Sequence, residues 1–257
     1  MQLKSQQFNP QGGNPLVVLH GLFGAQDNWR SQVLLWAQER HVITMDLRNH
    51  GMSPHHEHID YAAMAADVVT SLDGLGLQQV DLLGHSMGGK VAMQIAFNQP
   101  HYLRSLLVAD IAPVVYTPRH DAIIAGLKAI DLINLSSRKQ ALGQLSKYEA
   151  DPRVCQFLLK SLYRNAAGQF AYRYNLTAIE ANYPAISAAP TGQTYTGPTL
   201  VLKGSASAYI LPQHKADFDA LLPQAQLKIM TDCGHWLHAE KPELFCSLVS
   251  RFLNKLA

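Results

Sequence analysis

Short, almost continuously apolar runs alternate along this chain with longer segments whose apolar residues recur every three or four positions. The apolar runs are residues 16–20, 41–46, 80–83, 103–110, 198–204 and 226–230. Runs of this length without regular polar alternation are typical of strands that helices cover on both faces, as in a parallel sheet. The pattern therefore predicts an α/β protein with a mostly parallel central sheet.

The segments between these runs show helical periodicity. In the clearest of them, residues 60–77, the apolar face consists of Tyr61, Met64, Val68, Leu72 and Leu75. Further helices are predicted at residues 28–39, 89–97, 215–222 and 242–256. Each follows a predicted strand, so the order of elements fits a sheet with helices on both faces.

Residues 113–198 interrupt this alternation. They show no convincing strand but several helical stretches, for example residues 121–132, 138–148 and 154–163. Such a segment is much longer than the loops that normally connect two strands. We therefore expect a helical cap over the strand ends, where open α/β sheets bind ligands. The predicted division is a core domain of residues 1–112 and 199–257 and a cap of residues 113–198.

Composition narrows the class of protein. The 257 residues are 47% apolar, enough for one large domain or one domain with an insertion. The formal net charge is +2 and no basic run exceeds a pair, so we expect no nucleic-acid partner. The N-terminus lacks a secretory apolar segment and no apolar run approaches ~18 residues, so we expect a cytoplasmic protein without a membrane partner. The oligomeric state stays open.

No metal site is expected. Cys155, Cys233 and Cys246 have no metal-ligand spacing, and their odd number argues against a disulfide framework. We interpret them as buried thiols. The histidines within residues 55–58 are interpreted as part of a solvated loop.

Residues 84–88 read Gly-His-Ser-Met-Gly, between an apolar run and a predicted helix. G-x-S-x-G at a strand-to-helix turn is the nucleophile elbow of the α/β-hydrolase fold, whose strained backbone presents the serine hydroxyl at the strand end. The glycines leave room for the strand and helix packed against the turn. A glycine-rich turn alone is a weak signal, but the flanking elements favour Ser86 as a nucleophile.

A serine nucleophile needs a general base, and histidine is the usual one. His235 follows the last predicted strand, and the order Ser, acid, His is that of the α/β-hydrolase fold. His238 is the main alternative, whereas His85 lies inside the elbow and cannot turn toward Ser86. We therefore assign the base to His235.

Backbone N–H groups should form the oxyanion hole. One is expected from Met87, the residue after the nucleophile. The other should come from the His-Gly-Leu-Phe-Gly turn at residues 20–24. We assign it to Leu22, with Phe23 as the alternative.

The acid is the least obvious member of the site. It usually follows the strand after the cap, but residues 203–210 contain no carboxylate. Asp110 ends the run before the cap, on the same rim of the predicted sheet as Ser86, so we assign the acid to Asp110. A turn-capping aspartate is the alternative interpretation. Asp46, at another strand end, is expected to fix a loop by pairing with Arg48.

Together these motifs resemble the YbfF-type bacterial esterases. The segments that carry the resemblance are residues 20–24, 46–51, 84–90, 110–113 and 234–236. It extends over nearly the whole chain, including the cap segment 156–161, and implies hydrolysis of carboxylic esters and thioesters, acyl-CoA included, without metal or organic cofactor. In that family the acid occupies the position matching Asp110. Residues 205–208 depart from the family's usual Gly-Asn-Ser-Pro type of turn, which affects the pocket rather than the triad.

The sequence therefore predicts a serine esterase or thioesterase that transfers an acyl group to water. Ser86 attacks the carbonyl, His235 carries the proton and Asp110 orients the imidazole. The N–H groups of Leu22 and Met87 hold the oxyanion.

Candidate substrate-binding residues are Phe23, Tyr209 and Trp236, with Met87, in an apolar acyl pocket, and Lys160 in the cap. The cap carries nine basic against five acidic residues, a net charge of +4. This excess suits an anionic substrate or leaving group, such as an acyl thioester of a phosphorylated carrier. Solvated surface helices would explain the same excess.

Other functions are compatible with the same fold. A C–C bond hydrolase or lyase would keep Ser86 and His235, and product analysis would separate it from an esterase. A haloalkane dehalogenase needs a carboxylate in place of Ser86. A non-enzymatic binding module is disfavoured because such relatives usually lose the nucleophile or the histidine.

Overall fold

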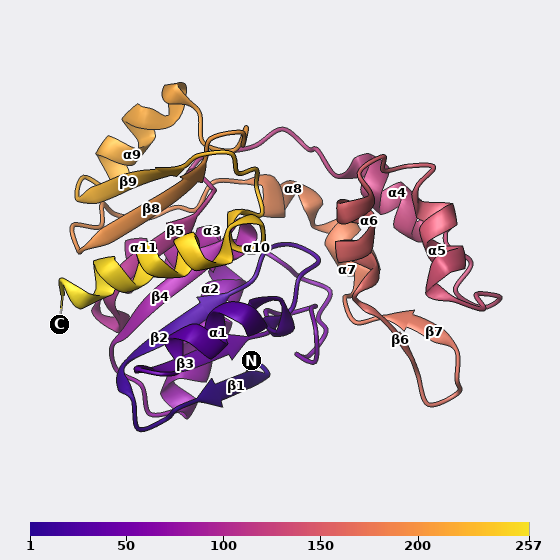
Figure 1. Cartoon of the computed structure of the whole chain (residues 1–257), viewed down its shortest axis with the longest axis horizontal. Coiled ribbons are helices and arrows are strands. Elements are labelled where there is room, and N and C mark those ends of the chain that lie inside the picture. The colour runs from indigo at the N-terminus through magenta and orange to yellow at the C-terminus, as the bar shows by residue number, and fades with distance from the viewer. Residues whose placement is uncertain (257) are drawn as a thin grey trace.

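A seven-stranded sheet forms the centre of the protein in a computed structural model that describes residues 1–256 (Figure 1). Its strands are β1 (Ser5–Phe8), β2 (Gly13–Leu19), β3 (Arg40–Met45), β4 (Val80–His85), β5 (Leu103–Ala109), β8 (Thr199–Gly204) and β9 (Ala225–Met230). Their order is β1-β3-β2-β4-β5-β8-β9, and every neighbouring pair is parallel except β1 with β3. The predicted α/β-hydrolase fold with a mostly parallel sheet is confirmed.

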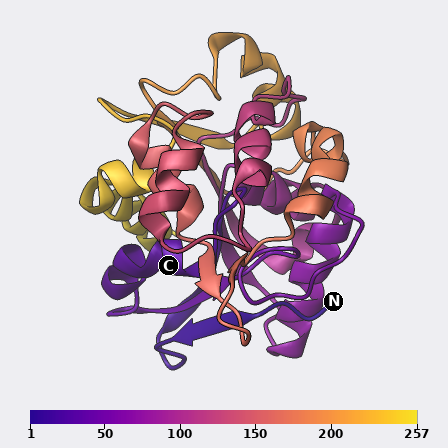
Figure 2. The same cartoon turned by 90° about the vertical axis from the view of Figure 1, so that its right-hand side faces the viewer.

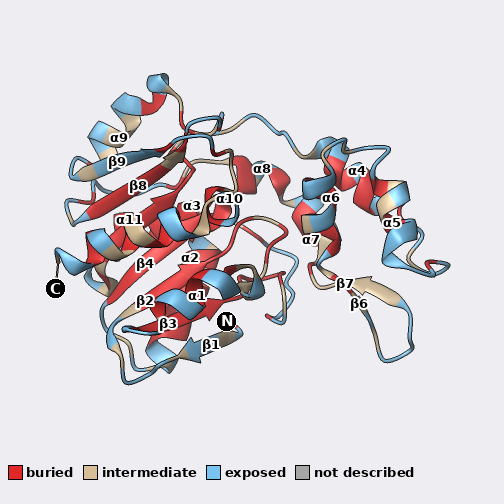
Figure 3. Cartoon of the chain, in the orientation of Figure 1, coloured by how far each residue is buried: buried red, intermediate tan, exposed pale blue. Residues whose placement is uncertain are grey.

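Helices cover both faces of this sheet. They are α1 (Arg30–Trp36), α2 (Tyr61–Gly74), α3 (Met87–Asn98), α9 (Lys215–Leu221), α10 (Leu237–Glu240) and α11 (Pro242–Asn254), with short 3-10 helices η1 (Gln26–Trp29), η2 (Pro100–Tyr102) and η3 (Pro212–His214). Successive strand side chains point to opposite faces. In β2, Leu16 and Val18 therefore pack with α1 and α11, while Val17 and Leu19 join a second apolar cluster with α2 and α3. Figure 3 shows buried inner strands between helices with exposed outer faces, while the edge strands β1 and β9 are intermediate to exposed.

Between β5 and β8 the chain leaves the sheet and forms a separate group of helices, which we call the cap (Figure 1). Its elements are α4 (Asp121–Ala129), α5 (Arg138–Leu145), α6 (Pro152–Leu159), β6 (Leu162–Arg164), β7 (Phe170–Tyr172), α7 (Leu176–Ala181) and α8 (Tyr183–Ser187). Seen from the cap side, these helices lie in front of the sheet (Figure 2). The cap is therefore placed to cover one end of the strands.

Two features of the fold were not predicted. Strand β1 reads Ser-Gln-Gln-Phe and pairs with β3 at the sheet edge, so it shows no apolar run. The antiparallel pair β6–β7 lies in a region where we expected helices alone. Its strands have three residues each, too few to show an alternating pattern.

No helix within residues 1–256 combines the length and the apolar character that a membrane span needs. In the same range, no group of histidine, cysteine and acidic side chains is arranged to hold a metal ion. The three cysteines are free and buried.

Candidate active site

Ser86 lies on a strained turn between β4 and α3. Its φ of 54° and ψ of −120° belong to a backbone conformation that L-residues rarely adopt. A Cβ added at Gly84 would lie 2.1 Å from the carbonyl oxygen of Gly88, and one added at Gly88 would lie 2.5 Å from that of His20. Only glycine fits at these two positions, and this explains the motif around Ser86.

His235 and Asp110, the predicted base and acid, are hydrogen-bonded to each other. The Nδ1 of His235 lies 2.8 Å from Oδ2 of Asp110, which is fully buried at the end of β5. Asp110 also accepts a hydrogen bond from the N–H of Gly204, at 3.0 Å, and another from the hydroxyl of Ser207. The carboxylate thus has three hydrogen-bond partners, one each from His235, Gly204 and Ser207.

Ser207 is a site residue that the sequence did not identify. It lies in the turn after β8, where the acid of this fold usually lies. Its hydroxyl donates to Asp110, which is 97 residues earlier in the sequence. A second carboxylate at this place would repel Asp110, whereas a hydroxyl supplies a hydrogen bond.

The position of His235 is also fixed by its neighbours. The Tyr209 ring stacks on the imidazole, with centroids 3.9 Å apart and planes 23° apart. The Nε2 of His85 lies 2.8 Å from the backbone carbonyl oxygen of His235. His238, the alternative base, instead stacks on Trp29, and burial lowers its pKa to about 3.

A cavity of about 250 Å³ lies beside Ser86 and His235. From the core it is lined by residues that include Leu22, Phe23, Trp29, Tyr209 and Trp236. From the cap it is lined by His120, Ile123, Val154, Phe157 and Leu158. Core and cap therefore enclose it together, and most of its wall is apolar. Three predicted substrate-binding residues, Phe23, Tyr209 and Trp236, are in that wall.

A second cavity, of about 50 Å³, shares Ser86 in its lining with the first. Met87 lines it, together with Lys90 and Arg119. The guanidinium of Arg119 lies 5.5 Å from the centre of the Tyr209 ring and forms no ion pair with a carboxylate of residues 1–256. A cation without an ion-pair partner thus lines the same cavity as Ser86.

Lys160 is not brought to either of these cavities. It is exposed and lines a different hollow of the cap, beside Lys139 and Leu142. Arg119, rather than Lys160, is the cap cation next to Ser86. The sequence could not distinguish Arg119 from Lys160, because both are exposed basic residues in the same insertion.

The two turns beside Ser86 present backbone N–H groups. That of Met87 is the first of α3 and belongs to the helix turn that has no intrahelical acceptor. In the other turn, the N–H of Phe23 donates to Nε2 of His50 at 3.2 Å. The N–H of Leu22 has no hydrogen-bond partner among residues 1–256. Of the two alternatives in this turn, Phe23 is therefore already engaged.

The predicted pairing of Asp46 with Arg48 is wrong. Asp46 accepts hydrogen bonds from the N–H groups of Gln26, at 2.7 Å, and Met52, at 2.9 Å, so it does fix a loop. Arg48 instead pairs with Asp67 of α2 at 2.6 Å. The sequence could not show this, because α2 meets the loop only in the folded protein.

A serine on a strained elbow, and a partly exposed histidine hydrogen-bonded to a buried aspartate near it, are features typical of an α/β-hydrolase. The model of the alpha/beta hydrolase family matches residues 16–248, and the chain belongs to this family. It is 40% identical over 247 residues to the mouse sn-1-specific diacylglycerol lipase ABHD11, covering 93% of this chain and 80% of that protein.

The chain is also similar to microbial esterases. The chain is 34% identical to the esterase YbfF of Escherichia coli, over 96% of this chain and 95% of that one. Among solved structures, a marine microorganism esterase superposes with a TM-score of 0.95 at 36% identity, covering 98% and 99% of the two chains. The resemblance to YbfF-type esterases is thereby confirmed.

Proposed function

We propose that this protein is a carboxylic ester hydrolase that forms an acyl-enzyme on Ser86, with His235 as base and Asp110 as its orienting acid. The hydrogen bond between Asp110 and His235, which lines the same cavity as Ser86, carries this proposal. The naming of its relatives as esterases and lipases supports ester hydrolysis as the reaction.

In the first half of the reaction, the Ser86 oxygen attacks the ester carbonyl while Nε2 of His235 takes its proton. Nδ1 is the nitrogen engaged by Asp110, so Nε2 carries the free lone pair. Asp110 stabilises the imidazolium that forms. The N–H groups of Leu22 and Met87 donate to the oxyanion, whose charge develops as the tetrahedral intermediate forms.

The intermediate then collapses, the ester bond breaks, and the leaving alcohol or thiol departs with the proton from His235. Water attacks the acyl-enzyme in the second half, and His235 accepts a proton from it. Release of the carboxylic acid returns that proton to Ser86. The apolar wall of the larger cavity suits an acyl chain.

Substitution of Ser86 tests the proposal. Ser86→Ala should lower kcat for p-nitrophenyl butyrate by about 10⁴- to 10⁶-fold, because losing one triad member removes the nucleophilic pathway. A fluorophosphonate probe should label the wild type once and the variant not at all. Ser146→Ala, at an exposed serine of the cap, is the matched control. A Ser86→Ala protein that keeps its activity or its label would refute the nucleophile.

The finer proposal concerns the substrate. An apolar cavity and an unpaired arginine meet at Ser86, which suits an ester or thioester that carries an apolar chain and an anionic group. Acyl-CoA thioesters combine both features. The diacylglycerol lipase relatives point to a neutral lipid ester as the second candidate.

Arg119→Gln separates these two candidates. We expect about a tenfold loss of kcat/KM for an acyl-CoA, the size of one exposed charge contact, and little change for diacylglycerol of the same acyl length. Lys160→Gln is the control with the same charge change outside the cavities. Equal effects of Arg119→Gln on both substrates would remove the anion-binding role while leaving ester hydrolysis intact.

A further inference from the structure

Two buried histidines, His20 and His50, stand outside the triad and have no role in the reaction as proposed. His20 is in the turn that follows β2, and His50 is in the loop that follows β3. Their side chains are 2% and 0% exposed, and the ring centroids lie 5.1 Å apart. Burying two imidazoles costs free energy unless each nitrogen finds a partner.

Each imidazole forms a hydrogen bond with the backbone of the segment that carries the other imidazole. His50 accepts the N–H of Phe23 at Nε2, at 3.2 Å, and its Nδ1 lies 2.8 Å from the carbonyl oxygen of Arg48. His20 accepts the N–H of Leu47 at Nε2, at 3.0 Å, and its Nδ1 lies 2.8 Å from the carbonyl oxygen of Gly21. We call this reciprocal pair the histidine brace.

The partners define the tautomer of both rings. A backbone N–H only donates and a carbonyl oxygen only accepts, so each Nε2 must be unprotonated and each Nδ1 must carry the hydrogen. Burial supports this state, since it lowers the pKa of His20 to about 4 and that of His50 to about 3. The rings therefore remain neutral acceptors near neutral pH.

The brace acts on the turn beside the nucleophile. Phe23 has a φ of 61°, a conformation that a bulky residue holds only when its surroundings impose it. A Cβ added at Gly21 would lie 3.2 Å from the Cβ of Ser86, so this turn packs directly against the serine. The N–H of Leu22, between these two residues, is left without a partner.

We propose that His50 is a positioning residue for the esterase reaction: by holding the N–H of Phe23 it keeps the N–H of Leu22 available to the oxyanion. His20 secures the loop that carries His50. This inference rests on the proposed serine-esterase function and gives a physical reason for Leu22, rather than Phe23, as the donor.

Two substitutions at His50 separate its two hydrogen bonds. Gln places its amide oxygen near the position of Nε2, so His50→Gln can keep an acceptor for Phe23. Asn places its amide nitrogen near the position of Nδ1, so His50→Asn keeps only the donor to Arg48. A purely structural role predicts similar losses for both, because both replace a buried ring by an amide.

We expect His50→Asn to lower kcat for p-nitrophenyl butyrate by roughly 10- to 100-fold with KM nearly unchanged, since loss of one oxyanion donor costs about 10²- to 10³-fold and misplacement should cost less. His50→Gln should recover most of this loss. An alkyl trifluoromethyl ketone, which forms a tetrahedral adduct on serine, should bind His50→Asn more weakly by the same factor. Affinity for the corresponding unreactive amide should not change.

Equal kcat in the two variants, or equal weakening of the ketone and the amide, would overturn the inference. Should a variant fail to fold, ¹⁵N chemical shifts of the wild-type imidazoles provide the second measurement. They should show the Nδ1–H tautomer for His50 at pH 7 and at pH 5, and an Nε2–H or protonated ring would also overturn the inference. An inactive, unlabelled wild type would instead refute the proposed function and leave this tautomer test valid.

Discussion

Core and cap contribute to the same cavity in different ways. Ser86 and Asp110 both have a φ of 54° and both stand at the ends of buried parallel strands. A strained backbone persists only where its surroundings determine it, and the covered sheet provides such surroundings. The cap supplies none of the proposed triad; its Phe157 and Leu158, for example, line the cavity from α6. The proposed triad thus comes from the core alone, whereas core and cap share the wall of the cavity.

The cap is nevertheless tied to the helix of the nucleophile. Lys90, four residues after Ser86, is buried, and its Nζ donates to the carbonyl oxygens of Val114, Ser187 and Ala188 at 2.8, 3.2 and 2.5 Å. Val114 lies where the chain enters the cap, and the other two where it returns. The side chain of Lys90 therefore joins both connections of the cap to α3.

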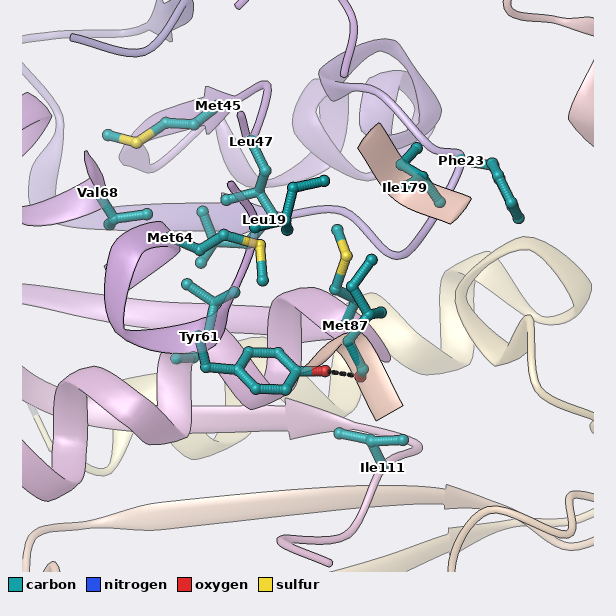
Figure 4. Packing of buried hydrophobic residues seen from close by; sticks show 14 of the residues in the cluster. Leu19, Phe23, Met45, Leu47, Tyr61, Met64, Val68, Met87, Ile111 and Ile179 are labelled. Carbon is teal, nitrogen blue, oxygen red and sulfur yellow. Dashed lines mark hydrogen bonds between the residues drawn. The ribbon is translucent and has the colours of Figure 1, made fainter. Parts of the chain in front are cut away.

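The return segment has further anchors. The hydroxyl of Tyr61 donates to the carbonyl oxygen of Ile186, drawn as a dashed line in Figure 4. Gln94 exchanges two hydrogen bonds with the backbone of Thr191. A wall built on a separate insertion can thus keep a defined position relative to Ser86.

The largest effect is expected from a substitution in the core, which tests whether the proposed triad lies there. Asp110→Asn should keep the fold but lower kcat by roughly 10⁴-fold, because the amide favours the wrong imidazole tautomer and does not stabilise the imidazolium. Ester hydrolysis by the purified variant measures this. Asp232→Asn, at an exposed acid near His235 in sequence, should stay within a few-fold of the wild type. A fully active Asp110→Asn protein would show that the acid is elsewhere.

The next largest effect concerns stability: the free energy of unfolding should fall as the pH is lowered. Burial lowers the pKa of His20, His50, His85 and His238, the first to about 4, the second and last to about 3, and that of His85 well below its usual value. Below about pH 6.5 the unfolded chain binds protons at these groups and the folded chain does not, so stability is lost as pH falls. Each group can contribute up to about 1.4 kcal/mol per pH unit.

Urea unfolding followed by tryptophan fluorescence measures this loss, because Trp29 and Trp36 are buried in the core. The free energy of unfolding should fall by several kcal/mol between pH 7.5 and pH 5, about 1 kcal/mol or more for each group. A free energy that stays constant over this range would mean that these rings are not buried as neutral groups.

The smallest effect concerns the cap. Phe157 lines the cavity, and its ring centroid lies 5.9 Å from that of Trp236. Phe157→Ala should lower kcat/KM about tenfold for a long-chain ester and leave an acetyl ester nearly unchanged, since lost apolar contact affects only chains that reach it. Phe170→Ala, on β7 of the cap, is the control. Equal losses for short and long chains would place Phe157 at the reacting centre instead.

The sequence by itself determined the features that depend on neighbours along the chain. Continuous apolar runs predicted the buried strands β2, β3, β4, β5 and β8, because burial on both faces leaves no room for polar alternation. The run at residues 226–230 instead forms the edge strand β9, which is largely exposed, so the expected burial was wrong there. The elbow around Ser86 and the order Ser, acid, His predicted the reaction class. A G-x-S-x-G segment between a strand and a helix forms a strained turn that exposes the serine hydroxyl. The absence of a carboxylate in residues 203–210 led to Asp110, to which His235 is hydrogen-bonded in the structure.

Only the tertiary structure decided which of several equivalent residues meet. Ser207 reaches Asp110 because β5 and β8 are neighbours in the sheet, and Arg119 rather than Lys160 lies beside Ser86 because of how the cap packs. The choice between Leu22 and Phe23 depends on His50, which the fold brings to this turn from 27 residues away. Such contacts join segments distant in sequence, and periodicity and short motifs report only local preferences.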